Sequence, residues 1–113
     1  MYTYYHNPRC QKSREGLALL EEAGASYILR KYLEEPLTQA ELEALLDKLA
    51  LPAEALIRQN EKDWKAHFKD KELSEEELIL AMIEYPKLMQ RPILESDKSA
   101  VLGRPPEKIK ELL

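Results

Sequence analysis

The residue of this chain best suited to covalent chemistry is its one cysteine, Cys10. It follows a β-prone run at residues 2–5 and a polar turn, and it comes directly before a segment with helical spacing. At such a junction the first backbone N–H groups of the helix lack partners and the helix dipole is positive. Both effects stabilise a thiolate. We therefore predict that Cys10 is a nucleophile with a lowered pKa, in preference to the alternative of a buried structural cysteine.

Cations surround Cys10 in the sequence: Arg9, Lys12 and Arg14. The helix dipole favours acidic residues in a first turn, so cations there suggest another purpose, such as binding an anion. For Arg14 a solvated face, on which the long stem covers apolar surface, is an equally good explanation.

The single cysteine also limits the redox chemistry of the chain. Cys10-x-x-Ser13 lacks the second thiol of a CxxC pair, so a second thiol must come from another molecule. An internal disulfide and a structural zinc site built from several cysteines are both excluded. A lone cysteine suits a reducing compartment, and the first residues lack an apolar h-region. We therefore expect a cytoplasmic protein without a signal peptide.

The elements around Cys10 predict a βαβ unit. A strand at residues 2–5 precedes a helix over residues 11–23, which Gly24 closes as a C-cap, and a second strand covers residues 27–32. The apolar stripe of this helix consists of Leu17, Leu20 and Ala23. A right-handed crossover would make the two strands parallel.

A helical stretch follows, and it carries two capping boxes, Thr38 to Glu41 and Ser74 to Glu77. Each precedes apolar residues at helical spacing, and Pro86 ends the second helix. A short helix is expected over residues 53–58. Residues 59–73 are polar and predict no clear element, and we attribute their Trp64 and Phe68 to packing.

The C-terminal part predicts a β-hairpin, with strands at residues 92–96 and 99–102, and then a helix that begins at Pro105 and Pro106. The fold class is therefore α/β, with a four-stranded mixed sheet flanked by helices. A helical insertion separates the βαβ unit from the hairpin. The length of 113 residues suits one domain over residues 1–113.

Composition narrows the possible functions. Hydrophobic residues make up 44% of the chain and charged residues 34%, as in globular proteins, and no apolar run could span a membrane. The net charge of −4 argues against general nucleic-acid binding.

Several motifs together resemble the glutaredoxin-dependent arsenate reductase family, and the likeness covers nearly the whole chain. They are His6-Asn-Pro-Arg-Cys10-x-Lys-Ser13-Arg14, Tyr32-Leu-Glu-x-Pro36, Leu56-Ile-Arg58-Gln-Asn60, the segment from Pro86 to Ile93, and Gly103-Arg104-Pro105. The chain is similar to a short subgroup of that family, since it ends before the extension that the best-characterised members carry. The resemblance implies a thioredoxin-like fold.

The resemblance also implies roles for single residues. Cys10 would be the nucleophile, and His6 would affect its reactivity, although a lone histidine beside a strand is often only a hydrogen-bonded neighbour. Pro92 would match the cis-proline that faces the catalytic cysteine. The residues expected to surround arsenate and its covalent adduct are Arg58, Arg91 and Arg104.

The partners implied are arsenate or a similar oxyanion, glutathione as co-substrate, and glutaredoxin. No bound cofactor or metal ion, no nucleic acid and no membrane is implied, and a monomer is expected.

Two other functions fit parts of the sequence. A related branch, the Spx-like proteins, binds RNA polymerase and commonly senses oxidation through CxxC, and Ser13 removes that switch here. A monothiol oxidoreductase that acts on glutathionylated proteins fits Cys10-x-x-Ser13 as well, but would need no oxyanion site.

Overall fold

The computed structural model describes residues 1–113, and the chain divides into two compact units. Unit 1 comprises Met1–Glu35 and Arg91–Leu113, and unit 2 comprises Pro36–Gln90. In sequence, unit 2 is therefore inserted into unit 1, as expected for a helical insertion between the βαβ unit and the hairpin. The single domain expected over residues 1–113 stays a prediction. None of the helices is long and apolar enough to cross a membrane.

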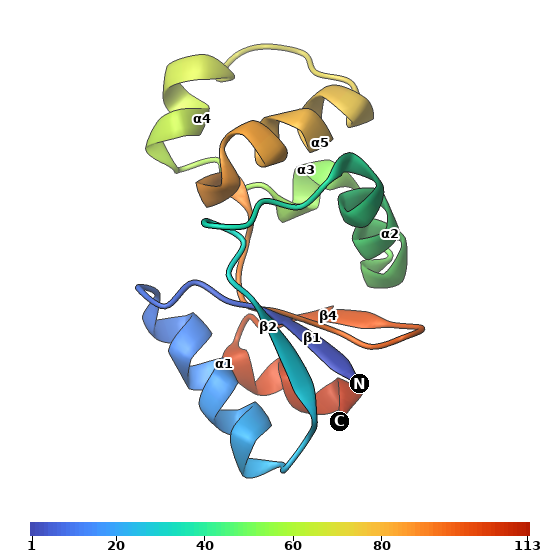
Figure 1. Ribbon diagram of the computed structural model, residues 1–113. Helices are drawn as coiled ribbons and strands as arrows, with labels where there is room; N and C mark the ends of the chain where they lie inside the picture. Colours follow the sequence, from blue (N-terminus) through green and yellow to red (C-terminus); the bar gives the residue numbers. More distant parts are fainter. The chain divides into compact units, whose positions relative to one another are not determined.

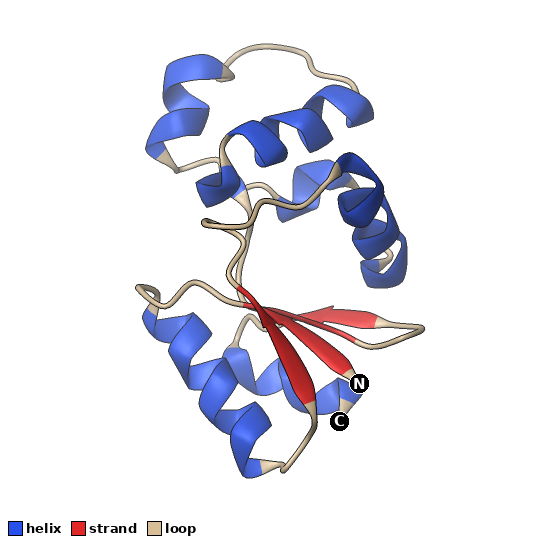
Figure 2. Ribbon diagram, in the orientation of Figure 1, coloured by secondary structure: helices blue, strands red, loops and turns tan.

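Unit 1 is built on a four-stranded mixed sheet (Figure 2). Its strands are β1 (Tyr2–Tyr5), β2 (Tyr27–Arg30), β3 (Ile93–Glu95) and β4 (Ala100–Leu102). They lie in the order β2-β1-β3-β4, with β1 parallel to β2 and antiparallel to β3, and with β3 antiparallel to β4. The predicted mixed sheet is confirmed.

Two helical elements, α1 (Gln11–Glu22) and the 3-10 helix η2 (Pro106–Leu112), lie on the same face of this sheet (Figure 1). Side chains from the sheet and both helices form a core in which Tyr4, Leu20, Leu94 and Ile109 are fully buried. At one edge of this core the hydroxyl of Tyr2 donates to the carbonyl of Leu112 at 3.0 Å, which joins the two ends of the chain. The core thus fixes α1, and the cysteine before it, against β1.

The closest approach of α1 to the sheet depends on Gly16. A Cβ at this position would collide with the hydroxyl of Tyr4 and lie 3.2 Å from Cγ of Pro92. That hydroxyl donates a hydrogen bond of 2.6 Å to the carbonyl of Ser13, one turn earlier. A side chain at position 16 would therefore push the first turn of α1 away from β1.

Unit 2 is helical. It contains α2 (Gln39–Leu49), α3 (Ala53–Leu56), α4 (Lys62–His67), α5 (Glu75–Glu84) and the 3-10 turn η1 (Pro86–Leu88). Both predicted capping boxes are present, because the Thr38 and Ser74 side chains accept from the N–H groups of Glu41 and Glu77. Pro86 follows α5, as predicted.

The structure corrects several predicted bounds. The strand expected at residues 27–32 ends at Arg30, because the carbonyl of Lys31 accepts hydrogen bonds from the next turn instead of from a ladder. The helix expected over residues 53–58 ends at Leu56, since Ile57 is extended and forms a β-bridge with Met89. Ala23, expected on the buried stripe of the first helix, is the exposed C-cap of α1.

Two further corrections concern helices. The polar stretch 59–73, which predicted no clear element, contains α4, in which the ring of Trp64 packs against that of the C-cap residue Phe68, with centroids 5.6 Å apart. The last helix is a 3-10 helix.

We predict that Gly16→Ala lowers the free energy of unfolding by about 1–3 kcal/mol, as overpacking in a core does. Helix propensity alone would act in the opposite direction, by about 1 kcal/mol. Urea unfolding measures the difference. In a Tyr4→Phe background, which lacks the colliding hydroxyl, the penalty should shrink. Equal stability of Gly16→Ala and the wild type would contradict the close approach.

Candidate active site around Cys10

Cys10 is the N-cap residue of α1, with extended backbone angles of φ −95° and ψ 123°. The loop before it is pinned locally, because the N–H of Cys10 donates to the carbonyl of Asn7 at 3.0 Å. Its own carbonyl accepts the first helical hydrogen bond, from Arg14, also at 3.0 Å. The side chain is largely buried, with 9% of its surface exposed. The sulfur is therefore held in place at the positive end of the helix, as the sequence predicted.

Arg91 contacts this sulfur directly, since its Nε donates to Sγ of Cys10 at 3.1 Å. The topology of the sheet explains why Arg91 lies next to Cys10. Tyr5, at the end of β1, pairs with Ile93, at the start of β3, and the two strands are antiparallel. The loop that follows β1 and the segment that precedes β3 therefore lie at the same end of these two strands. The Arg91–Pro92 peptide bond is cis.

The pKa of the Cys10 thiol lies below its ordinary value. Burial on its own raises this pKa, because it disfavours the thiolate. The backbone N–H of Ser13, the guanidinium of Arg91 and the backbone N–H of Lys12 act in the opposite direction, and together they prevail. The thiolate is thus stabilised by the first turn of α1 and by one arginine.

Ser13 is the centre of a buried polar network beneath the cysteine. The side chain is fully buried, and its hydroxyl accepts from the N–H of Asn7 at 2.9 Å. The same oxygen lies 2.8 Å from Nδ1 of His6, in a shared hydrogen bond. His6 therefore contacts Ser13. Its burial, together with the charges of Lys31 and Arg14, lowers the pKa of this imidazole. The ring is thus biased toward its neutral form.

Arg104 lies beside Arg91 in unit 1. Its Nη1 donates to the carbonyl of Arg91 at 3.4 Å, and its side chain is exposed. With Lys12 and Pro105 it lines a hollow of about 230 Å³. The fold therefore brings two of the three predicted arginines, Arg91 and Arg104, to the cysteine end of unit 1.

Arg58 belongs to unit 2, where it follows α3. Its guanidinium pairs with Glu61 at 3.0 Å and donates to the carbonyl of Lys87 at 3.3 Å, while its backbone N–H donates to Leu88 at 2.7 Å. These contacts fix its stem within unit 2. Its role toward the Cys10 sulfur stays a prediction.

Comparison with known proteins decides the family. The model of the ArsC family matches residues 5–112. The chain belongs to the ArsC family. It is 48% identical over 111 residues to YfgD of Escherichia coli, covering 96% of this chain and 93% of that one. It is 38% identical over 111 residues to an arsenate reductase of Haemophilus influenzae, covering 96% of each.

The ArsC fold is also shared with solved structures. An arsenate reductase from Vibrio cholerae superposes with a TM-score of 0.93 at 43% identity, over 99% of this chain and 97% of that chain. The expected thioredoxin-like fold is therefore confirmed, as is the family that the sequence motifs predicted.

Two residues at this ArsC site were not predicted as functional. Ser13 was considered only as the residue that replaces a second cysteine, and Lys12 only as one of several cations. The signal for Ser13 was its spacing of three residues from an N-cap, which places its N–H where it can reach the capping side chain. Its link to His6 depends on β1 and could not be deduced from spacing alone.

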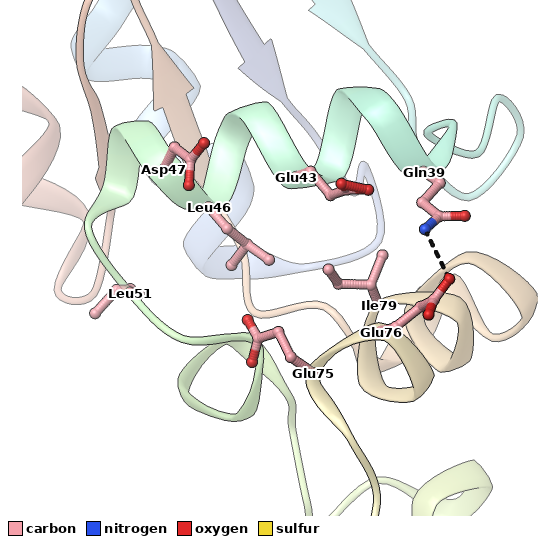
Figure 3. A pocket seen from close by; sticks show the side chains of 8 residues that line it. All are labelled: Gln39, Glu43, Leu46, Asp47, Leu51, Glu75, Glu76 and Ile79. Carbon is pink, nitrogen blue, oxygen red and sulfur yellow. Dashed lines mark hydrogen bonds between the residues drawn. The ribbon is translucent and has the colours of Figure 1, made fainter.

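Unit 2 has a larger hollow, of about 540 Å³, between α2 and α5 (Figure 3). Carboxylates of Glu43, Asp47, Glu75 and Glu76 line it, so it is unsuited to an oxyanion. Two of these acids have structural partners, as Glu75 accepts from the N–H of Ala53 at 2.9 Å and Glu76 from Gln39 at 3.4 Å. No group of three or more His, Cys, Asp or Glu side chains is arranged to hold a metal ion.

We predict that the rate of Cys10 alkylation by iodoacetamide has its pH midpoint below that of a free cysteine, which is about 8.5. The reactive thiolate is populated above this midpoint and is lost as the pH falls through it. In Arg91→Gln the midpoint should move to higher pH, because the guanidinium that favours the thiolate is gone. Lys110→Gln, on the exposed side of η2, serves as the control. A profile that Arg91→Gln leaves in place would contradict the predicted electrostatic role.

Proposed function

We propose that this protein reduces arsenate to arsenite through a covalent adduct on Cys10, which glutathione and glutaredoxin resolve. The observation that carries the proposal is the state of the Arg91 guanidinium. Its Nε binds the Cys10 sulfur at 3.1 Å, while its Nη1 is buried and has no hydrogen-bond partner in the protein. A buried charged donor without a partner is costly. An oxyanion next to the sulfur would satisfy it.

Arginine suits this substrate for electrostatic reasons. Arsenate is an anion, and a thiolate that attacks it brings two negative charges together. A guanidinium stays charged, and its planar fork can donate to two oxygens at once. In this proposal Arg91 and Arg104 supply the charge from unit 1, and Arg58 adds a third guanidinium.

The proposed reaction has three steps. The Cys10 thiolate attacks arsenic, an As–O bond breaks, and the departing oxygen leaves as water after taking up a proton. The thiolate of glutathione then attacks the Cys10 sulfur, and the S–As bond breaks with its electron pair on arsenic, so As(V) becomes As(III) and arsenite leaves. Glutaredoxin finally attacks the mixed disulfide, takes the glutathionyl group and restores the Cys10 thiolate.

In this proposal the arginines contribute more to catalysis than the lowered pKa of the thiol does. Lowering the pKa of a thiol increases the thiolate fraction, but it also weakens the nucleophile, so the two effects partly cancel. A charge-assisted hydrogen bond to an oxyanion contributes about 1.5–3 kcal/mol. His6 in this scheme is a positioning residue, which orients Ser13 and thereby the loop that carries Cys10.

The deciding test is an NADPH-coupled assay with arsenate, glutathione and glutaredoxin. Cys10→Ser should abolish turnover. Arg91→Ala should lower kcat/KM roughly 10- to 150-fold, the rate equivalent of one lost charge-assisted hydrogen bond. Arg91→Lys should fall between this variant and the wild type, because it keeps the charge and loses the fork. Lys110→Ala should behave as the wild type.

Full activity of Cys10→Ser would refute the adduct. The competing functions have their own signatures. A monothiol oxidoreductase would reduce glutathionylated proteins, and arsenate would not protect its Cys10 from alkylation. A Spx-like regulator would bind RNA polymerase in a pull-down and would not turn over arsenate.

A further inference from the structure

We propose that β2 pairs with β2 of a second copy of this chain, in an antiparallel register centred on Ile28, so that two four-stranded sheets join into one. The inference departs from the monomer expected from the sequence. It does not depend on the proposed function, because β2 lies at the edge of the sheet and the site around Cys10 uses none of its residues.

The outer side of β2 has backbone groups that lack a neighbouring strand. In the order β2-β1-β3-β4, β2 pairs with β1 alone (Figure 1). The carbonyls of Ser26 and Arg30 accept from N–H groups of β1 and of the residue that follows it, at 3.1 Å and 2.9 Å. Backbone groups of alternate residues point to opposite sides of a strand, so those of Tyr27 and Leu29 point away from β1. Two N–H and two carbonyl groups are therefore available to another strand.

The side chains of this edge are apolar and exposed. Ile28 is 57% exposed and Leu29 is 38% exposed, whereas β4, at the opposite edge, has no exposed side chain. Leu29 is paired with Tyr4 and so lies on the face that carries α1, but α1 makes its close approach over β1, at Gly16. Edge strands are commonly protected from pairing by lysine or proline, and β2 contains neither. The edge is thus open to another strand.

The register centred on Ile28 uses all the outward backbone groups. If Ile28 faces Ile28 of the other copy, Tyr27 of each copy faces Leu29 of the other, and the two strands exchange four hydrogen bonds. The three central pairs are then apolar, and Arg30 faces Ser26 instead of another cation. Centring the pairing on Leu29 would keep only two such bonds within the strand and would place Ile28 opposite Arg30. The edge is therefore self-complementary about Ile28, as a two-fold symmetric interface must be.

Charges next to the strand also favour a second copy as the occupant. The hydroxyl of Tyr27 donates to the carboxylate of Glu21 at 3.1 Å, near the start of β2. Lys31 follows the end of β2 and is exposed. Antiparallel pairing brings the end of one strand to the start of the other, so Lys31 of each copy approaches Glu21 of the other. The two-fold axis repeats this opposite-charge contact at both ends of the ladder.

The test traps the dimer with a disulfide, because a strand of 4 residues is far smaller than the roughly 20–30 residues per side of a standard interface and the dimer should be weak. In Cys10→Ser/Ile28→Cys the two new cysteines should have Cα atoms about 4.5 Å apart, which a disulfide can span. Diamide, a thiol oxidant, should convert this variant to a species of twice the mass on a non-reducing gel. In the control Cys10→Ser/Ser26→Cys the cysteines would be about 14 Å apart, so it should stay monomeric.

Sedimentation velocity gives a second readout that needs no added cysteine. The sedimentation coefficients of the wild type and of Ile28→Val should rise with protein concentration. Ile28→Lys should keep the monomer value at every concentration, because its two ammonium groups would meet at the two-fold axis.

Equal crosslinking of the Ile28→Cys and Ser26→Cys variants would overturn the inference, as would a wild-type sedimentation coefficient that does not rise with concentration. Faster crosslinking of Cys10→Ser/Leu29→Cys than of the Ile28→Cys variant would overturn the register. Neither experiment involves arsenate or turnover. Failure of the dimer and failure of the proposed function are therefore separate outcomes.

Discussion

The sulfur of Cys10 and the guanidinium of Arg91 lie 81 positions apart in sequence, yet they are within hydrogen-bond distance. Their contact exists because β1 and β3 are antiparallel neighbours, so the exit of one strand and the entry of the other coincide. The anchors of that pairing are deep in the core, where Tyr4 and Leu94 face each other and are fully buried. The interactions that stabilise the pairing of β1 with β3 therefore also keep the Arg91 guanidinium next to the Cys10 sulfur.

The loop that carries Cys10 is held rigid by buried polar groups whose hydrogen bonds are satisfied. Ser13 accepts from Tyr4 through its carbonyl and bonds Asn7 and His6 through its hydroxyl, while its N–H helps to lower the pKa of the Cys10 thiol. A buried network of this kind costs little once every member has a partner, and it fixes one arrangement of the loop. Gly16 permits this by letting α1 approach Tyr4. The chemistry above the network can then rely on a sulfur that does not need to be positioned by its ligand.

Local signals predicted much of this structure. The capping boxes at Thr38 and Ser74 and the cysteine at a helix start depend on neighbours within a few residues, so the sequence shows them directly. The end of β2 and the position of α4 depend on competition between weak local preferences and tertiary packing, and here the sequence predictions were wrong or absent. The arginines were found through motifs shared with a family. Spacing alone does not predict which distant charges meet, because a strand pairing decides it.

The depth of Ser13 has an evolutionary consequence. A cysteine there would complete a CxxC pair, so the chain itself would supply the thiol that resolves Cys10, and an external reductant would still be needed to reopen the resulting disulfide. Sulfur is larger than oxygen and a poorer hydrogen-bond partner, and this position has no exposed surface and short contacts of 2.8 Å and 2.9 Å to His6 and Asn7. Such a lineage would have to rebuild the whole loop first. The need of the proposed reaction for a resolving thiol from outside the chain is thus linked to the packing of the first helical turn.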